Sequence, residues 1–210
     1  MNIPIKEKVK MFKYAVFHPF DGFYEIRFRH KGSLGIALTM MILYGILNCF
    51  SFQYTGFIMN NHKPIYEMNS ITTFISAVTL IILFTVSNWT ITTLFNGKGR
   101  LVDIFIVVCY SLAPIIVVNT AAVMISNVII EEEIMILQAV QGLAIVWFIF
   151  ILLAGLCTIH EYTFLDNIGA IIATFISAVI IIFIGILFFT MIEQMMSFAV
   201  SVVEEFIRRL

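Results

Sequence analysis

Five long apolar runs follow a polar N-terminal segment, and they lie near residues 34–57, 71–95, 101–126, 137–159 and 168–192. Each run holds about 20 residues or more, so an α-helix rising 1.5 Å per residue would cross a hydrocarbon core of roughly 30 Å. The connections between the runs are too short to hold a second domain. The pattern predicts an all-α polytopic membrane protein, with a five-transmembrane-helix bundle over 34–192.

The first 33 residues form the only extensive polar region, which we interpret as a basic amphipathic segment. Its apolar positions recur at helical spacing and are Ile5, Val9, Phe12 and Val16. Such a pattern is typical of a helix that lies in the membrane interface. We expect His18-Pro19 to end this helix, residues 20–24 to form a turn, and a second short amphipathic stretch to follow. The candidate lipid-surface contacts are Lys6, Lys10, Lys13, Arg27 and Arg29.

The C-terminal residues 193–210 continue the helical pattern after the fifth run. Apolar positions including Met195, Val202 and Phe206 form a stripe, and Glu204 and Arg208 lie off it. This pattern predicts an amphipathic C-terminal helix, which either extends the fifth span or lies on the far membrane surface.

The composition agrees with membrane residence and excludes several functional classes. Hydrophobic residues make up 61% of the 210 positions and charged residues 12%, so a soluble fold of this size could not bury its apolar surface. The net charge of −1 argues against a nucleic-acid partner. The three cysteines, Cys49, Cys109 and Cys157, lie in apolar runs without CxxC spacing, so we expect no metal, cofactor or disulfide framework.

The positions of lysine and arginine predict the orientation. Basic residues gather in the N-terminal segment and in the loop with Lys98 and Arg100, whereas Lys63 stands alone in the first loop. Because basic loops stay in the cytoplasm, we expect a multi-pass protein of the cell membrane with a cytoplasmic N-terminus. Five spans would place Arg208 and Arg209 outside, against this rule, so the side of the C-terminus stays open.

The stretch between the second and third runs carries the clearest local signals for a turn and a kink. Gly97 and Gly99 tolerate positive φ and would let the chain reverse tightly. Asp103 lies one helical turn from Arg100, which predicts an ion pair at the membrane edge. Pro114 removes a backbone hydrogen bond in mid-span and predicts a kink, with the Ser111 hydroxyl available to the freed Tyr110 carbonyl.

One polar cluster resembles a metal or acid–base site. His160 and Glu161 lie close to Cys157 and Asp166 near the end of the fourth run. Two ligands do not complete a zinc site, so we favour a polar loop with His160 as an interfacial cap. We therefore expect no catalytic residue in this chain.

Small residues recur in the fifth run in steps of four or eight, at Gly169, Ala173, Ser177 and Gly185. Small side chains let two membrane helices approach closely. This stripe is the candidate interface for a partner helix, which can belong to this chain or to another protein.

The order of several short motifs resembles the Yip-one domain family of small five-span membrane proteins, especially its bacterial members. The resemblance rests on His18-Pro19-Phe20-Asp21-Gly22-Phe23, Asn88-Trp89, Gly97-Lys98-Gly99 with Asp103, Leu112-Ala113-Pro114 and His160-Glu161. It implies five helices, a cytoplasmic N-terminus and no known enzymatic chemistry. Several bacterial relatives resemble accessory proteins of ATP-driven sugar importers, and eukaryotic members act in vesicle traffic.

The leading functional hypothesis is a non-enzymatic accessory, scaffold or stabilising subunit for another membrane protein, such as an importer permease, or for further copies of itself. A small-solute or lipid channel or carrier, using a cavity opened by the Pro114 kink, is the first alternative. A trafficking-type adaptor and a membrane enzyme working through His160, Glu161 and Cys157 are the others.

Overall fold

The computed structural model describes residues 4–56, 58, 59 and 69–209, which form helices and no strands. The predicted loop position Lys63 and the end of the first predicted span, residue 57, lie outside this part. A 3₁₀ turn, Glu131–Glu133, precedes α7, and the α-helices are α1 (Ile5–Phe17), α2 (Pro19–Arg29), α3 (Leu34–Tyr54), α4 (Ser70–Leu94), α5 (Leu101–Ser111), α6 (Ala113–Ile125), α7 (Ile134–His160) and α8 (Phe164–Arg209).

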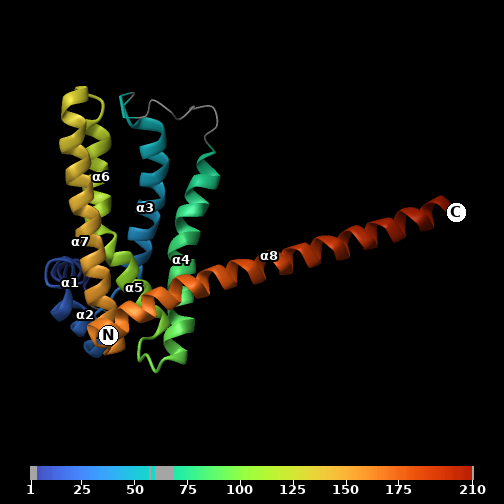
Figure 1. The fold of residues 1–210 in the computed structure, drawn as a ribbon, viewed down its shortest axis with the longest axis horizontal. Helices are drawn as coiled ribbons and strands as arrows, with labels where there is room; N and C mark the ends of the chain where they lie inside the picture. The colour runs from blue at the N-terminus through green and yellow to red at the C-terminus, as the bar shows by residue number, and fades with distance from the viewer. Residues whose placement is uncertain (1–3, 57, 60–68, 210) are drawn as a thin grey trace.

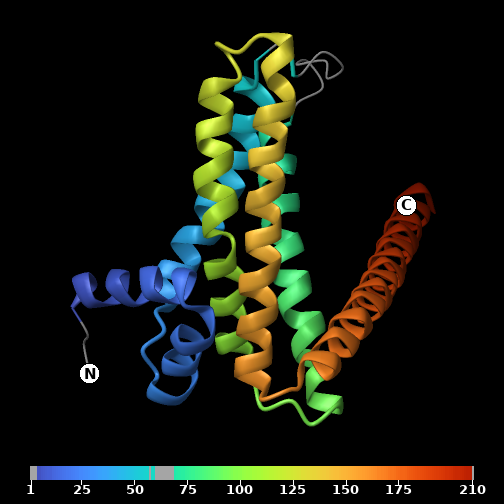
Figure 2. The same ribbon diagram turned by 60° about the vertical axis from the view of Figure 1, so that its left-hand side comes forward.

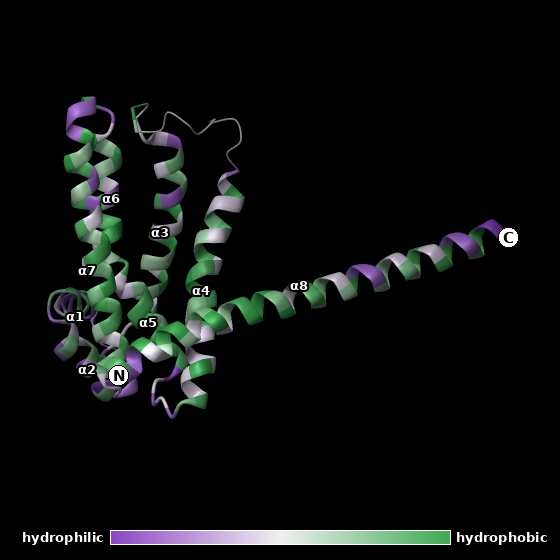
Figure 3. Cartoon of the chain, viewed as in Figure 1, coloured by the Kyte–Doolittle hydropathy of each residue, from purple (hydrophilic) through white to green (hydrophobic). Residues whose placement is uncertain are grey.

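The prediction of five membrane-spanning helices is confirmed. The described part contains five helical segments long and apolar enough to cross a membrane, with α5 and α6 counted as one. The helices α3, α4, α6 and α7 run roughly alongside one another, and α5 continues the line of α6 (Figure 1). Apolar residues make up most of these helices, as a lipid-facing bundle requires (Figure 3).

The core lies where α1 and α2 pack against α5 and α7. Phe23, Ile104 and Ile151 are fully buried there, and Phe12 meets the ring of Tyr110 edge-on at a centroid distance of 4.9 Å. The helix α1 lies crosswise to α6 and α7, at the foot of the bundle (Figure 2). The second half of its predicted apolar stripe therefore faces protein, and only the first half remains exposed.

The predicted turn over residues 20–24 is wrong, because these residues lie inside α2. Pro19 stands in the first helical turn, where a missing N–H costs no intrahelical bond. Gly22 then lets α2 approach α1 closely, since a Cβ at Gly22 would lie 2.4 Å from the Cα of Ala15. The helix is favoured because it buries Phe23 in the core, which the local turn signal does not reveal.

The third span is interrupted near Pro114, where the sequence predicted a kink, and the hydrogen bonding there differs from the expectation. The helix α5 ends at Ser111 and α6 begins at Ala113. The Ser111 hydroxyl donates to the carbonyl of Val107 at 2.7 Å and not to that of Tyr110. The side chain therefore bonds one turn back within its own helix, as serines in membrane helices commonly do.

The helix α8 differs from the other spans in length and direction. Its 46 residues form one continuous helix, about 69 Å long at 1.5 Å per residue, so residues 193–209 extend the fifth span directly. Its first turns cross α4, and the rest of the helix leaves the bundle at a large angle to α3, α4, α6 and α7 (Figures 1 and 2). Among the described residues of α8, none after Ser177 is buried.

Candidate functional site

The polar residues singled out by the sequence gather at one end of the bundle. We call this the basic end and define it by the C-terminus of α2, the α4–α5 connection, the C-terminus of α7 and the root of α8, Phe164–Ser177. These four segments lie next to one another at the foot of the bundle (Figures 1 and 2). The opposite end carries the Glu131–Glu133 turn.

Asp103 is the centre of a charged cluster at the basic end. Its side chain is only 3% exposed, and its carboxylate accepts from Arg100 Nε at 2.8 Å and from Arg27 Nη1 at 3.0 Å. The predicted Arg100 pair is therefore confirmed, and Arg27 adds a second cation from α2. Arg27 also donates through Nη2 to the carbonyl of Lys98, which fastens α2 to the α4–α5 connection.

A second ion pair lies on the exposed side of the same connection. Lys98 pairs with Glu161, which follows the last residue of α7. Glu161 takes the left-handed conformation with φ of 58° and ends α7 through its backbone N–H, which donates to Cys157. Both side chains remain substantially exposed, so this pair contributes little to stability and mainly ties the connection to α7.

His160 is buried within a hydrogen-bonded chain and does not cap the helix at the interface as predicted. Its side chain is 2% exposed, and its Nδ1 accepts from the backbone N–H of Gly99 at 3.2 Å. Because Nδ1 accepts, a neutral ring carries its proton on Nε2, which lies 3.3 Å from Asn88 Oδ1. The imidazole therefore joins α7 to α4 and to the α4–α5 connection.

The chain of hydrogen bonds continues from Asn88 into the root of α8. Asn88 Nδ2 donates to Thr174 Oγ1 at 3.0 Å, and the Thr174 hydroxyl donates to the carbonyl of Ala170 at 2.7 Å. Nearby, the Tyr162 hydroxyl donates to the carbonyl of Phe95 at 2.9 Å. Buried polar groups in a membrane need such partners, so this network fixes the root of α8 against α4.

The glycines of the α4–α5 connection serve close approach and not positive φ, which corrects the expectation. The left-handed residue of this turn is Asn96, with φ of 58°, and no glycine of the described part has positive φ. A Cβ at Gly99 would lie 2.5 Å from Cε1 of His160, and one at Gly97 would lie 2.8 Å from its Nδ1. Both glycines are needed because the imidazole occupies that space.

The chemistry available to this cluster is hydrogen bonding and ion pairing within the protein. Among the described residues, no group of three or more His, Cys, Asp and Glu side chains is placed to hold a metal ion. Two buried side-chain atoms of this part of the chain have no hydrogen-bond partner, Arg27 Nε and Ser87 Oγ. Burial raises the pKa of the Tyr162 hydroxyl, and Asp166 adds to that rise.

The four residues of the predicted partner-helix stripe differ in their exposure. Ser177 is buried, and Ala173 is half-buried. A Cβ added at Gly169 or at Gly185 would meet no heavy atom within 4 Å, so both glycines have open space beside them. The residues that actually bury the root of α8 are Asn167, Ala170, Thr174 and Ser177.

The predicted lipid-contact residues also divide into two groups. Lys6, Lys10 and Lys13 are exposed on α1. Arg27 instead points to Asp103, and Arg29 forms an ion pair with Glu25 at 3.0 Å.

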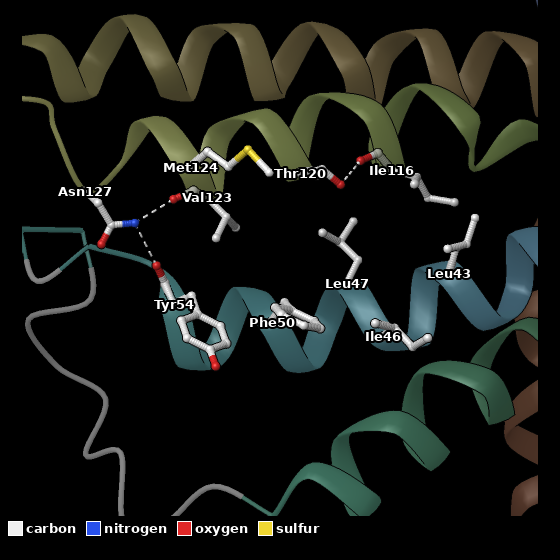
Figure 4. Close-up of a pocket in the computed structure, with 10 residues that line it drawn as sticks. All are labelled: Leu43, Ile46, Leu47, Phe50, Tyr54, Ile116, Thr120, Val123, Met124 and Asn127. Atoms are coloured by element: carbon white, nitrogen blue, oxygen red, sulfur yellow. Dashed lines mark hydrogen bonds between the residues drawn. The ribbon is translucent and has the colours of Figure 1, made fainter.

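An apolar groove lies between α3 and α6, on the far side of the kink from the basic end. It has a volume of about 430 Å³, and at one end Asn127 Nδ2 donates to the carbonyls of Tyr54 and Val123 at 3.0 and 2.8 Å (Figure 4). The sequence did not indicate this groove. Its lining residues are Leu43, Ile46, Leu47, Phe50, Tyr54, Ile116, Thr120, Val123, Met124 and Asn127.

The geometry brings together motifs that are far apart in the sequence, and one known family matches the stretch of chain that carries them. The Yip1 domain matches residues 13–199, which include α2, the α4–α5 connection, His160 and the root of α8. Searches of curated proteins and of solved structures found no match. Since the family match covers most of the chain, this protein belongs to the Yip1 domain family of multi-pass membrane proteins.

Proposed function

We propose that this protein is a non-enzymatic accessory or scaffold subunit that holds another integral membrane protein through α8. The observation that carries the proposal is the separation of α8 from its own bundle. After Ser177 the helix buries no residue against the described chain, although residues 178–192 are strongly apolar. A helix that is hydrophobic all round belongs in a membrane or in the core of an assembly.

The direction of α8 supports a partner outside this chain. When α3, α4, α6 and α7 stand upright in the bilayer, α8 leads away from them (Figure 2). Gly185 lies in this free part, and the space beside it lets another helix come close. Of the predicted small-residue stripe, Gly169 and Gly185 have open space for a partner helix, whereas Ser177 is buried within this chain.

The placement of charge supports a cytoplasmic N-terminus in the cell membrane. The basic residues of α1, α2 and the α4–α5 connection all lie at one end, and the Glu131–Glu133 turn lies at the other. Basic residues next to spans resist translocation, so the basic end faces the cytoplasm.

The class of partner rests on analogy. The resemblance to accessory proteins of ATP-driven sugar importers suggests an importer permease as the partner. The alternative partner is a second copy of this chain. Both would pack helices against α8.

A matched pair of variants tests the role of α8. Gly185 and Gly142 are both glycines in spans with open space for a Cβ, but Gly142 lies on α7. The full chain carrying G185W or G142W is purified in mild detergent, and partner stoichiometry is measured by mass spectrometry. G185W is expected to lose a stoichiometric membrane-protein partner that the unaltered chain and G142W retain. Recovery of the unaltered chain as a lone monomer in repeated preparations would refute the proposal.

Lipid handling is a second candidate, favoured by the groove between α3 and α6. Its walls are almost wholly apolar, which suits an acyl chain better than a polar solute (Figure 4). Leu47→Trp would narrow the groove, and vesicles reconstituted with this variant are expected to move labelled phospholipid more slowly than those with the unaltered chain. Equal rates with and without protein would retire this candidate.

A further inference from the structure

A basic hollow lies beside α1, away from the charged cluster at Asp103. It has a volume of about 740 Å³, and residues on one exposed face of α1 line it together with Lys31, which stands between α2 and α3. Three lysines contribute to its wall, Lys10, Lys13 and Lys31. A second hollow of about 450 Å³ adjoins it and shares Lys31 as a wall.

Two of these lysines are free to bind an anion. Neither Lys10 nor Lys13 forms an ion pair with any residue that the structure describes. Lys31 Nζ lies 2.6 Å from Glu25, but Arg29 also pairs with that carboxylate, so the local balance stays positive. The two cations hold the pKa of Glu25 below its ordinary value, with the hydrogen bond from Lys31 as the main cause.

Lys31 places one wall of the hollow next to the start of the first candidate span. Lys31 precedes Leu34, the first residue of the first candidate span, by three positions. The helix α1 lies crosswise to the spans at this level (Figure 2). Interfacial helices place basic side chains among lipid headgroups and apolar side chains against the acyl region.

Apolar side chains on the same wall distinguish a lipid from a soluble anion. Met11 and Phe17 line the hollow with the lysines, and the Phe17 side chain is 68% exposed. A soluble phosphate compound would gain nothing from these contacts, whereas a lipid can cover them with its glycerol backbone and upper acyl carbons.

We propose that this hollow binds the headgroup of one anionic glycerophospholipid, with its phosphate between Lys10, Lys13 and Lys31. Arg27 takes no part, because its guanidinium is held by Asp103. Glu7 also lines this hollow, and its carboxylate repels a bound anion. The site therefore combines the two unpaired lysines Lys10 and Lys13 with Lys31, which also pairs with Glu25, and with the repelling carboxylate of Glu7.

Native mass spectrometry of the full chain in a non-ionic detergent tests the site. The protein is titrated with dioleoyl phosphatidylglycerol, with dioleoyl phosphatidylcholine and with glycerol phosphate. We expect one phosphatidylglycerol to bind at least about 10-fold more tightly than either of the other two. A basic side chain near an anionic lipid is worth about 5-fold in affinity, so K10Q/K13Q should remove most of this preference.

Matched variants separate a defined site from general attraction to a basic helix. K6Q/K8Q removes the same two charges from α1 at positions that do not line the hollow, and should weaken binding less than about 3-fold. E7Q should tighten binding by about 3-fold or more, an increase that a damaged fold would not produce. Equal losses in the two double-lysine variants, or tight binding of glycerol phosphate alone, would overturn the proposal.

Discussion

The substitution Asp103→Asn tests whether the charged cluster at the basic end holds the fold together. Asparagine keeps the size of the side chain and removes its charge. Asp103 is buried beside two guanidinium groups, and the Arg27 side chain is only 17% exposed. Removing one partner from a buried ion pair typically costs about 3–5 kcal/mol, because the other charge is left without compensation.

Arg100→Gln provides the matched control for this prediction. Arg100 contacts the same carboxylate at 2.8 Å, but its side chain is 55% exposed and water can replace its partner. Exposed pairs contribute about 0–1 kcal/mol, so this variant should lose far less stability than Asp103→Asn. Arg27→Gln should fall between the two, because its carboxylate partner keeps Arg100.

Thermal unfolding in detergent, followed by size-exclusion chromatography of heated samples, measures these differences. At roughly 2–4 °C per kcal/mol for a chain of this size, Asp103→Asn should lower the Tm by on the order of 10 °C, and Arg100→Gln by about 3 °C or less. Equal losses of Tm in Asp103→Asn and Arg100→Gln would show that burial does not determine how much each charged residue of the cluster contributes to stability. An unchanged Tm in Asp103→Asn would refute the reasoning entirely.

Three further outcomes follow from the same geometry. Gly99→Ala should lower the Tm strongly, because a Cβ there meets the His160 ring at 2.5 Å, whereas Gly142→Ala should be neutral or slightly stabilising. His160→Ala should cost about 1–3 kcal/mol for each group it leaves unpaired, the Gly99 N–H and the side-chain Oδ1 of Asn88, as measured by the same unfolding assay. The pKa of Glu25 is lowered in the folded chain, so its contribution to stability is present above the ordinary value of 4.5 and is lost as the pH falls below it. Glu25→Gln should therefore lower the Tm slightly at neutral pH, leave it nearly unchanged well below pH 4.5, and so flatten the decline of the Tm with falling pH.

The helices were predictable because their signal is local and long. An apolar run of 20 residues bounded by polar loops leaves few alternatives, and the five candidate spans lie where those runs lie. The break near Pro114 was predictable for the same reason, since a ring without an N–H acts on its own helix. Residues 20–24 were mispredicted because a short turn signal competed with the burial of Phe23, which depends on distant helices.

The contacts of the candidate site were not predictable from one sequence. Arg27 and Asp103 are 76 positions apart, and Asn88 and Thr174 are 86 apart, so no spacing rule connects them. Asn88 donates to Thr174 on another helix, whereas Asn48 donates to the carbonyl of Tyr44 in its own helix. A polar residue in a span indicates that a partner exists and does not identify it.

The root of α8 is fixed by a buried polar network, whereas the rest of the helix is free, and one function can explain both features. Buried polar groups within a membrane are costly unless fully paired, and here Asn88 and His160 use theirs to fix the root of α8 through Thr174. The same helix then continues for 32 residues after Ser177 without burying any of them in its own chain. Burying a polar network costs free energy, and a helix that faces only lipid does not need its direction fixed in this way. It is well suited to aiming a rigid helix at a second protein, because fixing its direction beforehand lowers the entropy lost on binding.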